Sequence, residues 1–403
     1  MSISVVIPTH DRLDLVKQAI RTVIEQGIED FELVVYDNSS KDELGVYIKS
    51  LENEKIIYGR SDSFLSVTES WNNAINLATK NYVILIGDDD GILPGALKKA
   101  RQLIDRYQSP DLIYSSILQF FHPGVAPWNP DGYVMHVKNG SFFADARVPF
   151  FLEDKYRISL VEDSIRLNRS FSFNMQAFIF KKEFLEKIRV NGNIFHSPFP
   201  DYYIANVAFY WAKNILISPL PIAIQGVSKP SFGFTLFNNL EIDGEALLNN
   251  GISKDKVYKS CENLIFPGKQ YNTNYVVAMQ YVINNTKTEK KFHVNYRKYR
   301  LLQLIELFRA NKLSTLESLR YDESLRSNLR INFFERLIIS CLIYSVRYNF
   351  IKKYIFEKFI NKISMTKFPA IIEIINSGDF NDTDDIFDRF TYGQENSINF
   401  LNK

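Results

Sequence analysis

The chain has 403 residues, of which 46% are hydrophobic and 23% charged, and its formal net charge is +2. This composition excludes a disordered chain and allows two domains, or one large domain with an additional part. The only cysteines, Cys261 and Cys341, lack metal-site or redox spacing, so we expect reduced thiols in the cytoplasm. We expect neither a signal peptide nor a transmembrane helix, because the longest apolar runs are about half of the ~20 residues that cross a bilayer.

The first 115 residues alternate between apolar, strand-like segments and amphipathic, helix-like segments. Strands are predicted at 3–7, 31–36, 55–58, 82–86 and 112–115, and helices at 13–24, 42–51, 67–78 and 94–107. Because parallel strands need crossover connections, this order predicts an α/β fold with a mainly parallel sheet flanked by helices. Ligand chemistry is then expected at the strand ends, in residues 8–12, 37–40 and 87–91.

The rest of the chain divides into three parts. Residues 117–174 are rich in aromatics, glycine and proline without a clear period, and we interpret them as an insertion on the acceptor side of the site. Regular spacing then predicts a strand at 176–180, helices at 182–188 and 204–213, and strands at 215–217 and 221–225. We place the end of the first domain at residue 230, a linker at 231–254 and a mostly helical C-terminal domain at 255–403. Helices are predicted there at 299–308, 313–329 and 332–363, and the acidic end is a candidate for disorder.

Three adjacent carboxylates, Asp88, Asp89 and Asp90, directly follow the most apolar strand. Such carboxylates raise each other's pKa unless a cation neutralises them, and their oxygens suit Mg²⁺ or Mn²⁺ bridging to phosphate. A cap for the next helix would explain an isolated Asp triplet equally well. However, a second predicted strand ends in Asp37, which could accept the N–H of a uracil-like base. The two strand ends together could therefore hold a nucleoside diphosphate.

Five motifs resemble those of family 2 glycosyltransferases with the GT-A fold. They are VVIPTHDR at 5–12, VVYDNSSKD at 34–42, WNNA at 71–74, GDDD at 87–90 and LPGAL at 93–97. The resemblance covers roughly residues 1–225. It implies a metal-dependent, inverting transfer of a sugar from a nucleotide diphosphate donor, with a UDP-sugar favoured, to a hydroxyl of a glycan or lipid-linked oligosaccharide. The expected setting is the synthesis of a bacterial surface polysaccharide.

The resemblance also implies individual roles. The nucleotide would be bound by residues from four of the motifs, namely Pro8, Thr9, Arg12, Asp37, Asn72, Asp88 and Asp89. Asp88 and Asp90 would stand for the aspartate-x-aspartate motif and bind Mn²⁺ or Mg²⁺. The sequence departs from the family at Gly87, which occupies the place of the usual first aspartate. Which carboxylate touches the metal is therefore open.

Inverting members of the family keep a catalytic base at the start of a helix after the acceptor region, where this sequence has Asp201. Partial burial can raise the pKa of such a carboxylate toward the working pH. A helix N-cap is the alternative explanation of Asp201. His196 is a second candidate for the base or a metal ligand, and Lys229 could reach the diphosphate, although an ordinary loop histidine and a solvated lysine are the simpler explanations.

Two rival functions share parts of this pattern. A sugar-phosphate nucleotidyltransferase has a similar alternating sheet but needs a glycine-rich loop after the first strand, and residues 8–12 do not form one. A non-catalytic scaffold that binds a nucleotide or glycan is suggested by Gly87 and Pro200, which stand at two motif positions. Donor hydrolysis would distinguish an enzyme from a scaffold.

The C-terminal part is basic. Residues 290–362 carry 16 Lys or Arg against 6 Asp or Glu, with aromatics between them. This bias fits a helix at the inner face of the cell membrane and fits equally well a helix that packs on a partner or a second copy. We expect the basic faces near residues 336–358 to be turned toward one of these. We expect no nucleic-acid partner, because the first domain is not basic and has no reader motif.

Overall fold

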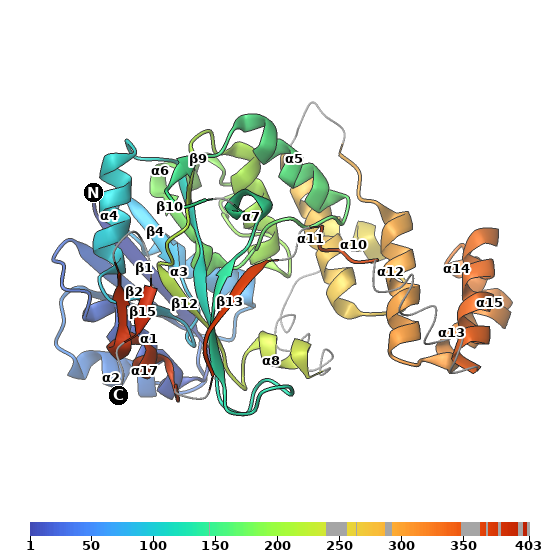
Figure 1. Cartoon of the computed structure of the whole chain (residues 1–403), viewed down its shortest axis with the longest axis horizontal. Coiled ribbons are helices and arrows are strands. Elements are labelled where there is room, and N and C mark those ends of the chain that lie inside the picture. The colour runs from blue at the N-terminus through green and yellow to red at the C-terminus, as the bar shows by residue number, and fades with distance from the viewer. Residues whose placement is uncertain are drawn as a thin grey trace. The chain divides into compact units, whose positions relative to one another are not determined.

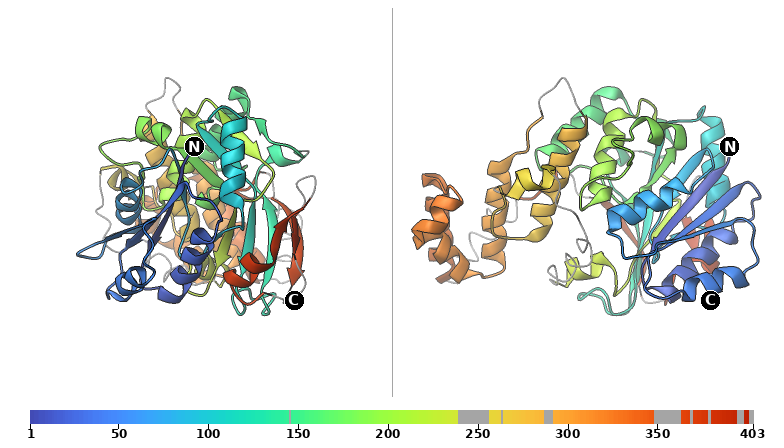
Figure 2. Two further views of the ribbon diagram at one scale, coloured as in Figure 1. Left: turned by 90° about the vertical axis from the view of Figure 1, so that its left-hand side faces the viewer. Right: turned by 180° about the vertical axis from the view of Figure 1, so that it is seen from behind.

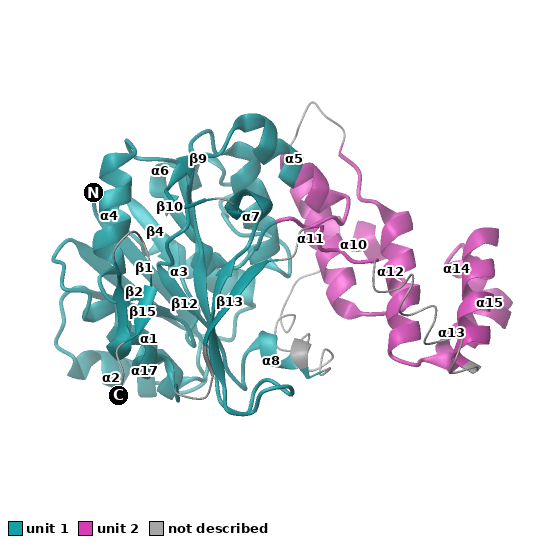
Figure 3. Ribbon diagram, viewed as in Figure 1, with its two compact units in different colours: residues 1–160, 171–252, 368–403 teal, residues 161–170, 253–367 magenta. Residues whose placement is uncertain are grey.

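The computed structural model describes residues 1–144, 146–238, 256–262, 264–286, 292–347, 363–367, 370–377, 380–393 and 398–400. The chain forms two compact units (Figure 3). Unit 1 consists of residues 1–160, 171–252 and 368–403, and unit 2 consists of residues 161–170 and 253–367. Each unit is therefore built from segments that are distant in the sequence.

The central sheet of unit 1 has eight strands in the order β3-β2-β1-β4-β10-β6-β11-β9 (Figure 1). Their bounds are β1 Ile3–Thr9, β2 Phe31–Asp37, β3 Ile56–Arg60, β4 Tyr82–Leu85, β6 Leu112–Ser115, β9 Phe150–Phe151, β10 Phe178–Lys181 and β11 Ile215–Ser218. The first four strands run parallel, and β6 runs parallel to β11, whereas β10 and β9 are antiparallel to their neighbours. The expected fold class, a mainly parallel α/β sheet with a helical C-terminal region, is confirmed.

Six helices of unit 1 lie close to their predicted positions, and two more, at 154–165 and 232–237, were not predicted. They are α1 Leu13–Ile24, α2 Glu43–Ser50, α3 Val67–Asn76, α4 Ala96–Arg106, α5 Asp154–Ile165, α6 Lys182–Lys187, α7 Pro200–Trp211 and α8 Phe232–Phe237, and α5 continues into unit 2. A capping box between Ser66 and Glu69 starts α3. Helix α4 starts after Gly95, whose φ of +68° interrupts the helix that the sequence predicts from Pro94.

The order of the strands brings three strand ends together. The chain moves outward from β1 to β2 and β3, and then returns to place β4 on the other side of β1. Thr9 at the end of β1 pairs with Asp37 at the end of β2, and Val6 pairs with Leu85 at the end of β4. Such a switch point is where open α/β sheets bind ligands. It is also where the predicted site motifs lie.

Residues 117–174, for which the sequence shows no period, form regular structure. They contribute β7 Ile117–Phe121 and β8 Tyr133–Lys138 to a second sheet of order β13-β8-β7-β12-β5, with β5 Gly91–Ile92, β12 Ala223–Val227 and β13 Ile371–Ser377. Both faces of β7 and β8 are largely buried. A strand that is buried on both faces does not alternate, which explains why the period was undetectable.

The C-terminal end differs from the expected helical domain of residues 255–403. Strand β13 pairs with β8, and helix α17 (Thr383–Arg389) and the hairpin of β14 (Phe390–Tyr392) and β15 (Ile398–Phe400) belong to unit 1. Three buried residues join the core of that unit, namely Phe380, Ile386 and Phe390. Arg21 of α1 pairs with Asp384 at 3.1 Å and Asp388 at 2.7 Å.

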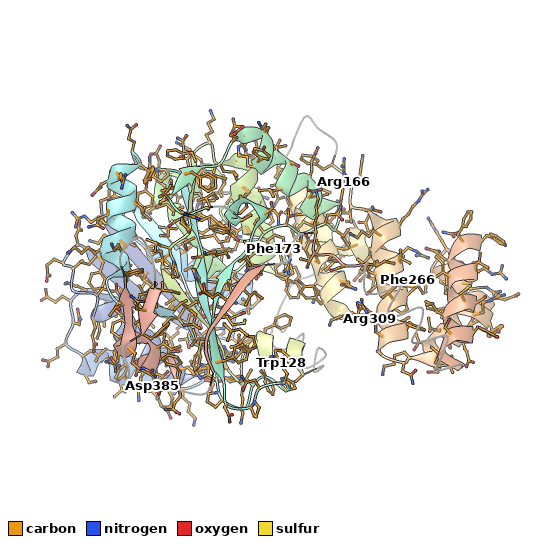
Figure 4. All side chains as sticks on the ribbon, in the orientation of Figure 1. Trp128, Arg166, Phe173, Phe266, Arg309 and Asp385 are labelled. Carbon is orange, nitrogen blue, oxygen red and sulfur yellow. The ribbon has the colours of Figure 1, made fainter. Side chains whose placement is uncertain are left out.

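The acidic end is therefore an ordered part of unit 1 over its described residues, and Asp379 lies outside them. Its carboxylates neutralise an arginine more than 360 positions earlier, and Asp385, labelled in Figure 4, lies in the first turn of α17. Sequence reasoning made the acidic end a candidate for disorder, because its cationic partner is not a neighbour in the chain.

Unit 2 is helical in the parts that are described. Its helices are α10 Lys256–Glu262, α11 Gln270–Thr286, α12 Tyr296–Arg309, α13 Leu313–Tyr321, α14 Glu323–Asn328 and α15 Phe333–Arg347. The helix predicted at 313–329 is divided at Asp322, whose side chain caps α14 by accepting the N–H of Leu325 at 3.0 Å. Residues 348–362 of the last predicted helix lie outside the described chain. In the described residues, every helix is too short or too polar to cross a membrane.

Candidate active site

A pocket of about 280 Å³ lies at the ends of β1 and β2, beside the first turns of α1 and α2. It is lined by Thr9, Asp11, Arg12, Leu13, Val16, Ser39, Ser40, Lys41, Glu43 and Leu44. Its volume is near the lower end, about 300 Å³, of small-molecule sites. Two of the predicted nucleotide-binding residues, Thr9 and Arg12, therefore line a pocket of suitable position and size, and Pro8 is buried in the strand just before them.

Asp88 connects the acidic loop, which we define as residues 88–90, to this pocket. Its Oδ2 accepts a hydrogen bond from Thr9 Oγ1 at 2.8 Å, and its Oδ1 lies 2.9 Å from Arg12 Nη1. Although burial opposes the charge of Arg12, the nearby aspartates, Asp88 above all, raise its pKa. Arg12 also donates to the carbonyl oxygen of Pro230. The structure thus brings together residues from the ends of β1 and β4 and from the segment after β12.

Asp89 is held by the end of β12. Ser228 donates to Asp89 Oδ2 from its hydroxyl at 2.6 Å and from its backbone N–H at 3.3 Å. Burial, together with the neighbouring charge of Asp88, raises the pKa of Asp89. The contact depends on Gly226, because a Cβ atom there would lie 1.7 Å from the carbonyl oxygen of Asp89. The acidic loop and β12 therefore touch backbone to backbone.

Asp90 points into the protein. Its Oδ1 accepts the N–H of Gly226 at 2.9 Å, and its Oδ2 accepts the N–H of Gly87 and the side-chain amide of Gln176. Burial, more than the adjacent carboxylate, raises the pKa of Asp90 to about 8. The family pattern implies that Asp88 and Asp90 act as a pair, but their side chains contact different elements. The hydrogen bonds of Asp90 hold the acidic loop against Gly226 and Gln176.

The acidic loop partly fits a divalent cation. Its carboxylate oxygens are the ligands that Mg²⁺ and Mn²⁺ prefer, and Mg²⁺ is often held by one or two carboxylates together with substrate phosphates. Within the described residues, no group of three His, Cys, Asp or Glu is arranged to hold a metal. Asp88, with Asp89 beside it, fits a one- or two-carboxylate site at the pocket. Asp90 fits less well, because three N–H groups already donate to its two oxygens, whereas each oxygen of Asp88 accepts one hydrogen bond, and metal binding by Asp90 stays a prediction.

Asp37 is the centre of a second polar group. Its Oδ1 accepts the N–H of Ser39 at 2.8 Å, and its Oδ2 accepts the hydroxyl of Tyr58 at 2.8 Å. Burial, followed by the hydrogen bond to Asp37, raises the pKa of Tyr58 and keeps that hydroxyl a donor. Arg60 Nη1 lies 3.8 Å from Asp37 and 2.7 Å from Asp42. A carboxylate offers about four acceptor positions, but the side chain of Asp37 is fully buried, so its contact with a ligand stays a prediction.

Sequence reasoning missed Tyr58 and Arg60. Their signal was weak, since it consisted only of two polar groups spaced two residues apart on β3, which places them on one face of the strand. Ser228 and Gln176 had no sequence signal at all. They reach the acidic loop from 139 and 86 positions away along the chain.

The side-chain amide of Asn72, which the family resemblance assigns to the nucleotide, is hydrogen-bonded within the protein. Its Nδ2 donates to the carbonyl oxygens of Thr68 and Phe195, each at 2.9 Å, and its Oδ1 accepts the N–H groups of Ile194 at 2.9 Å and Phe195 at 3.0 Å. These bonds use both donors and both lone pairs of the amide. Asn72 therefore anchors the loop before α7 to α3, and its contact with a nucleotide stays a prediction.

Asp201 is the second residue of α7. Pro200 occupies the first helical position and Phe199 the cap position, so Asp201 is not the N-cap that the sequence left as an alternative. Asp201 is partly exposed, and a carboxylate in the first turn is stabilised by the helix dipole. The loop that leads to it is fixed to α3 by Asn72 and by Thr68, whose hydroxyl donates to Ser197 O at 2.7 Å.

The two secondary candidates differ in their surroundings. His196 Nε2 lies 3.2 Å from the carbonyl oxygens of both Val190 and Asn193, as expected of an ordinary loop histidine. Lys229 is exposed and follows Ser228, the residue that binds Asp89, and its side chain passes beside Gly124. Its contact with a diphosphate stays a prediction.

The fold and the pocket define an α/β protein with a candidate ligand site at the switch point of its sheet. Residues 4–175 match the family described as glycosyl transferase family 2.

Similar curated proteins include the GalNAc(5)-diNAcBac-PP-undecaprenol beta-1,3-glucosyltransferase of Campylobacter jejuni, with 29% identity over 103 residues, or 25% of this chain and 33% of the relative. The PGL/p-HBAD biosynthesis glycosyltransferase of Mycobacterium tuberculosis is 26% identical over 120 residues, or 28% of this chain and 46% of the relative. The putative colanic acid biosynthesis glycosyl transferase WcaA of Escherichia coli is 32% identical over 97 residues, or 24% of this chain and 35% of the relative. The chain thus spans less than half the length of these relatives.

Two solved structures are also similar. S. aureus TarS 1-349 in complex with UDP-GlcNAc has a TM-score of 0.45 and 14% identity, with 87% of this chain and 92% of that chain covered. The mannosyltransferase PcManGT from Pyrobaculum calidifontis, in complex with GDP-Man and Mn²⁺, has a TM-score of 0.37 and 12% identity. The match covers 86% of this chain and 87% of that chain. Both similarities are too low to indicate a shared substrate.

Proposed function

We propose that the protein is an inverting glycosyltransferase. It transfers a sugar from a nucleotide diphosphate donor, with a UDP-sugar favoured, to a hydroxyl of a glycan or lipid-linked oligosaccharide in cell-surface polysaccharide synthesis. The observation that carries this proposal is the cluster of Thr9, Arg12 and Asp88 beside a pocket at the switch point, within the segment that matches family 2. The PP-undecaprenol named for the Campylobacter jejuni relative supports a lipid-linked acceptor.

Each group at the site then has a chemical task. Asp37 accepts the N–H of the base, and Thr9 and Arg12 line the pocket beside the nucleotide. Mn²⁺ or Mg²⁺, when bound at Asp88, would supply positive charge for the departing diphosphate. Asp201 takes the proton of the acceptor hydroxyl while the hydroxyl oxygen attacks the anomeric carbon of the donor sugar. The bond between that carbon and the diphosphate breaks on the opposite side. This displacement inverts the anomeric configuration.

A non-catalytic nucleotide- or glycan-binding scaffold is the second candidate. The observation in its favour is that all three carboxylates of the acidic loop already have partners within the protein. A scaffold binds the donor without cleaving it, so the two candidates differ in whether free nucleoside diphosphate is released.

The experiment that tests the proposal uses a panel of UDP-, GDP- and dTDP-sugars with Mn²⁺. Thermal shift identifies the donor that binds, and release of nucleoside diphosphate is then followed with and without EDTA. We expect slow donor hydrolysis that EDTA suppresses. Binding without hydrolysis supports the scaffold, whereas no stabilisation by any nucleotide sugar contradicts the transferase and the nucleotide-binding scaffold and leaves only a glycan-binding scaffold.

We expect Asp37→Ala to weaken UDP binding much more than it weakens Mn²⁺ binding. A hydrogen bond to a charged group contributes ~1.5–3 kcal/mol, which corresponds to about tenfold to hundredfold in affinity. Titration calorimetry with UDP and with Mn²⁺ measures the two affinities. Asp42→Ala is the matched control, because Asp42 contacts Tyr58 and Arg60 but lies outside β2. Equal UDP affinity in the parent and Asp37→Ala proteins would refute the assignment.

Asp88→Asn and Asp90→Asn test which carboxylate binds the metal. We expect Asp88→Asn to remove the Mn²⁺ dependence of nucleotide binding. We expect Asp90→Asn chiefly to lower the melting temperature, because its NH₂ group would face either the N–H group of Gly226 or that of Gly87, at a cost of ~1–3 kcal/mol. If only Asp90→Asn removes the metal dependence, the ligand is Asp90, as the family motif implies.

A further inference from the structure

Helix α15 of unit 2 is apolar on two sides. One side packs against α12 and α13 and contains the buried residues Ile339, Leu342 and Ile343. The other side, which we call the outer face, has large exposed side chains, with exposed fractions of 73% for Phe333, 74% for Phe334, 54% for Leu337 and 55% for Tyr344. Figures 1 and 2 both show α15 at the end of unit 2 that is distant from α11.

The exposed residues form one continuous strip. Residues 333, 337 and 344 are separated by four and seven positions, so they lie on the same side of an α-helix, and Phe334 and the exposed Cys341 border them. A helix of a globular protein normally presents polar residues on the side that faces away from the core. An exposed apolar strip of this kind indicates an interaction surface.

The charges beside the outer face are positive. Arg330 and Arg336 are exposed on either side of the two phenylalanines. The only acidic residue of α15, Glu335, is turned away from solvent and pairs with Arg300 through both of its oxygens. Residues 292–347 carry ten Lys or Arg against five Asp or Glu. The surface is therefore apolar and cationic, without an acidic residue of its own helix to balance it.

We propose that the outer face of α15 docks onto an anionic lipid surface. Exposed aromatic and aliphatic side chains enter the boundary between headgroups and acyl chains, while arginines at the rim contact anionic headgroups. A second copy of the chain fits this surface less well, since a two-fold arrangement would bring arginines together with no acidic residue of α15 available to pair with them. The inference is independent of glycosyl transfer, although docking would bring the protein close to a lipid-linked acceptor.

Vesicle flotation with the full chain tests this proposal. We expect binding to vesicles that contain phosphatidylglycerol, little binding to pure phosphatidylcholine vesicles, and a decrease in binding as salt is raised. Because each basic residue near such a surface contributes about 1 kcal/mol, Arg330→Gln with Arg336→Gln should weaken binding about thirtyfold. Phe333→Ser with Phe334→Ser should weaken it at least about tenfold.

The matched control is Val46→Ser, which replaces an apolar residue of α2 that is 68% exposed in unit 1 and should leave vesicle binding unchanged. All four replaced residues of unit 2 are exposed, and melting curves verify that the variants fold. Equal binding by the parent and the phenylalanine variant, or no binding to anionic vesicles, would overturn the proposal. A dimer in light scattering that the phenylalanine variant loses, without lipid binding, would instead assign the face to a second copy.

Discussion

Asp201→Asn is expected to lower kcat by about 10²- to 10⁴-fold, the usual contribution of general-base catalysis, while donor affinity barely changes. The asparagine has nearly the shape of the aspartate but cannot accept the proton of the acceptor hydroxyl. Donor affinity is unaffected because the proposed nucleotide contacts come from β1, β2 and the acidic loop. Initial rates with acceptor, together with calorimetric titration of the donor, measure the two effects separately.

The position of Asp201 in α7 makes this test clean. Since Phe199 is the cap residue, the substitution removes no capping bond. The loss of the interaction with the helix dipole costs ~0.3–1 kcal/mol of stability. Glu183→Gln is a suitable control, because Glu183 is a carboxylate in the first turn of α6 and has no proposed part in the reaction. Normal turnover of Asp201→Asn would show that the base lies elsewhere, with His196 the next residue to test.

Gly226→Ala is expected to abolish detectable turnover and to weaken nucleotide binding by at least about tenfold. The new Cβ atom would lie 1.7 Å from the carbonyl oxygen of Asp89, whereas real Cβ contacts are essentially never below 3.0 Å. Because the atom in the way belongs to the backbone, either β12 or the acidic loop must move. Movement separates Ser228 from Asp89 and Gly226 from Asp90, and Asp88 is displaced with the loop.

Gly192→Ala is the matched control for Gly226→Ala. Gly192 has a φ of +83° and open space around its Cβ position, so alanine there costs ~1–2 kcal/mol of backbone strain without a clash. Melting curves and UDP affinity are compared for both variants at a temperature where both are folded. Parent-like affinity and turnover in Gly226→Ala would contradict the view that contact with β12 sets the position of the acidic loop.

Local patterns in the sequence were sufficient to predict the first part of the fold and the general place of the site. The apolar runs at 3–7, 31–36 and 82–86 became β1, β2 and β4, because unbroken apolar strands must be covered on both faces. Alternation with helices then determined a parallel sheet, and the switch point of that sheet brought Thr9, Asp37 and Asp88 to one edge. These steps depend on apolar runs and on the order of strands and helices along the chain, and both can be read from neighbouring residues.

Only the tertiary structure decided which partner each polar group has. Asp90 was assigned to a metal from the family resemblance, and its partners Gln176 and Gly226 lie 86 and 136 positions away. Asn72 was assigned to the nucleotide, yet its amide is saturated by bonds to the loop before α7 that no local pattern announces. The acidic C-terminal residues likewise join unit 1 through Arg21, 367 positions from Asp388. Periodicity reports how much of a side chain is buried, whereas hydrogen bonds and ion pairs depend on distances of a few ångström that exist only after distant segments have packed.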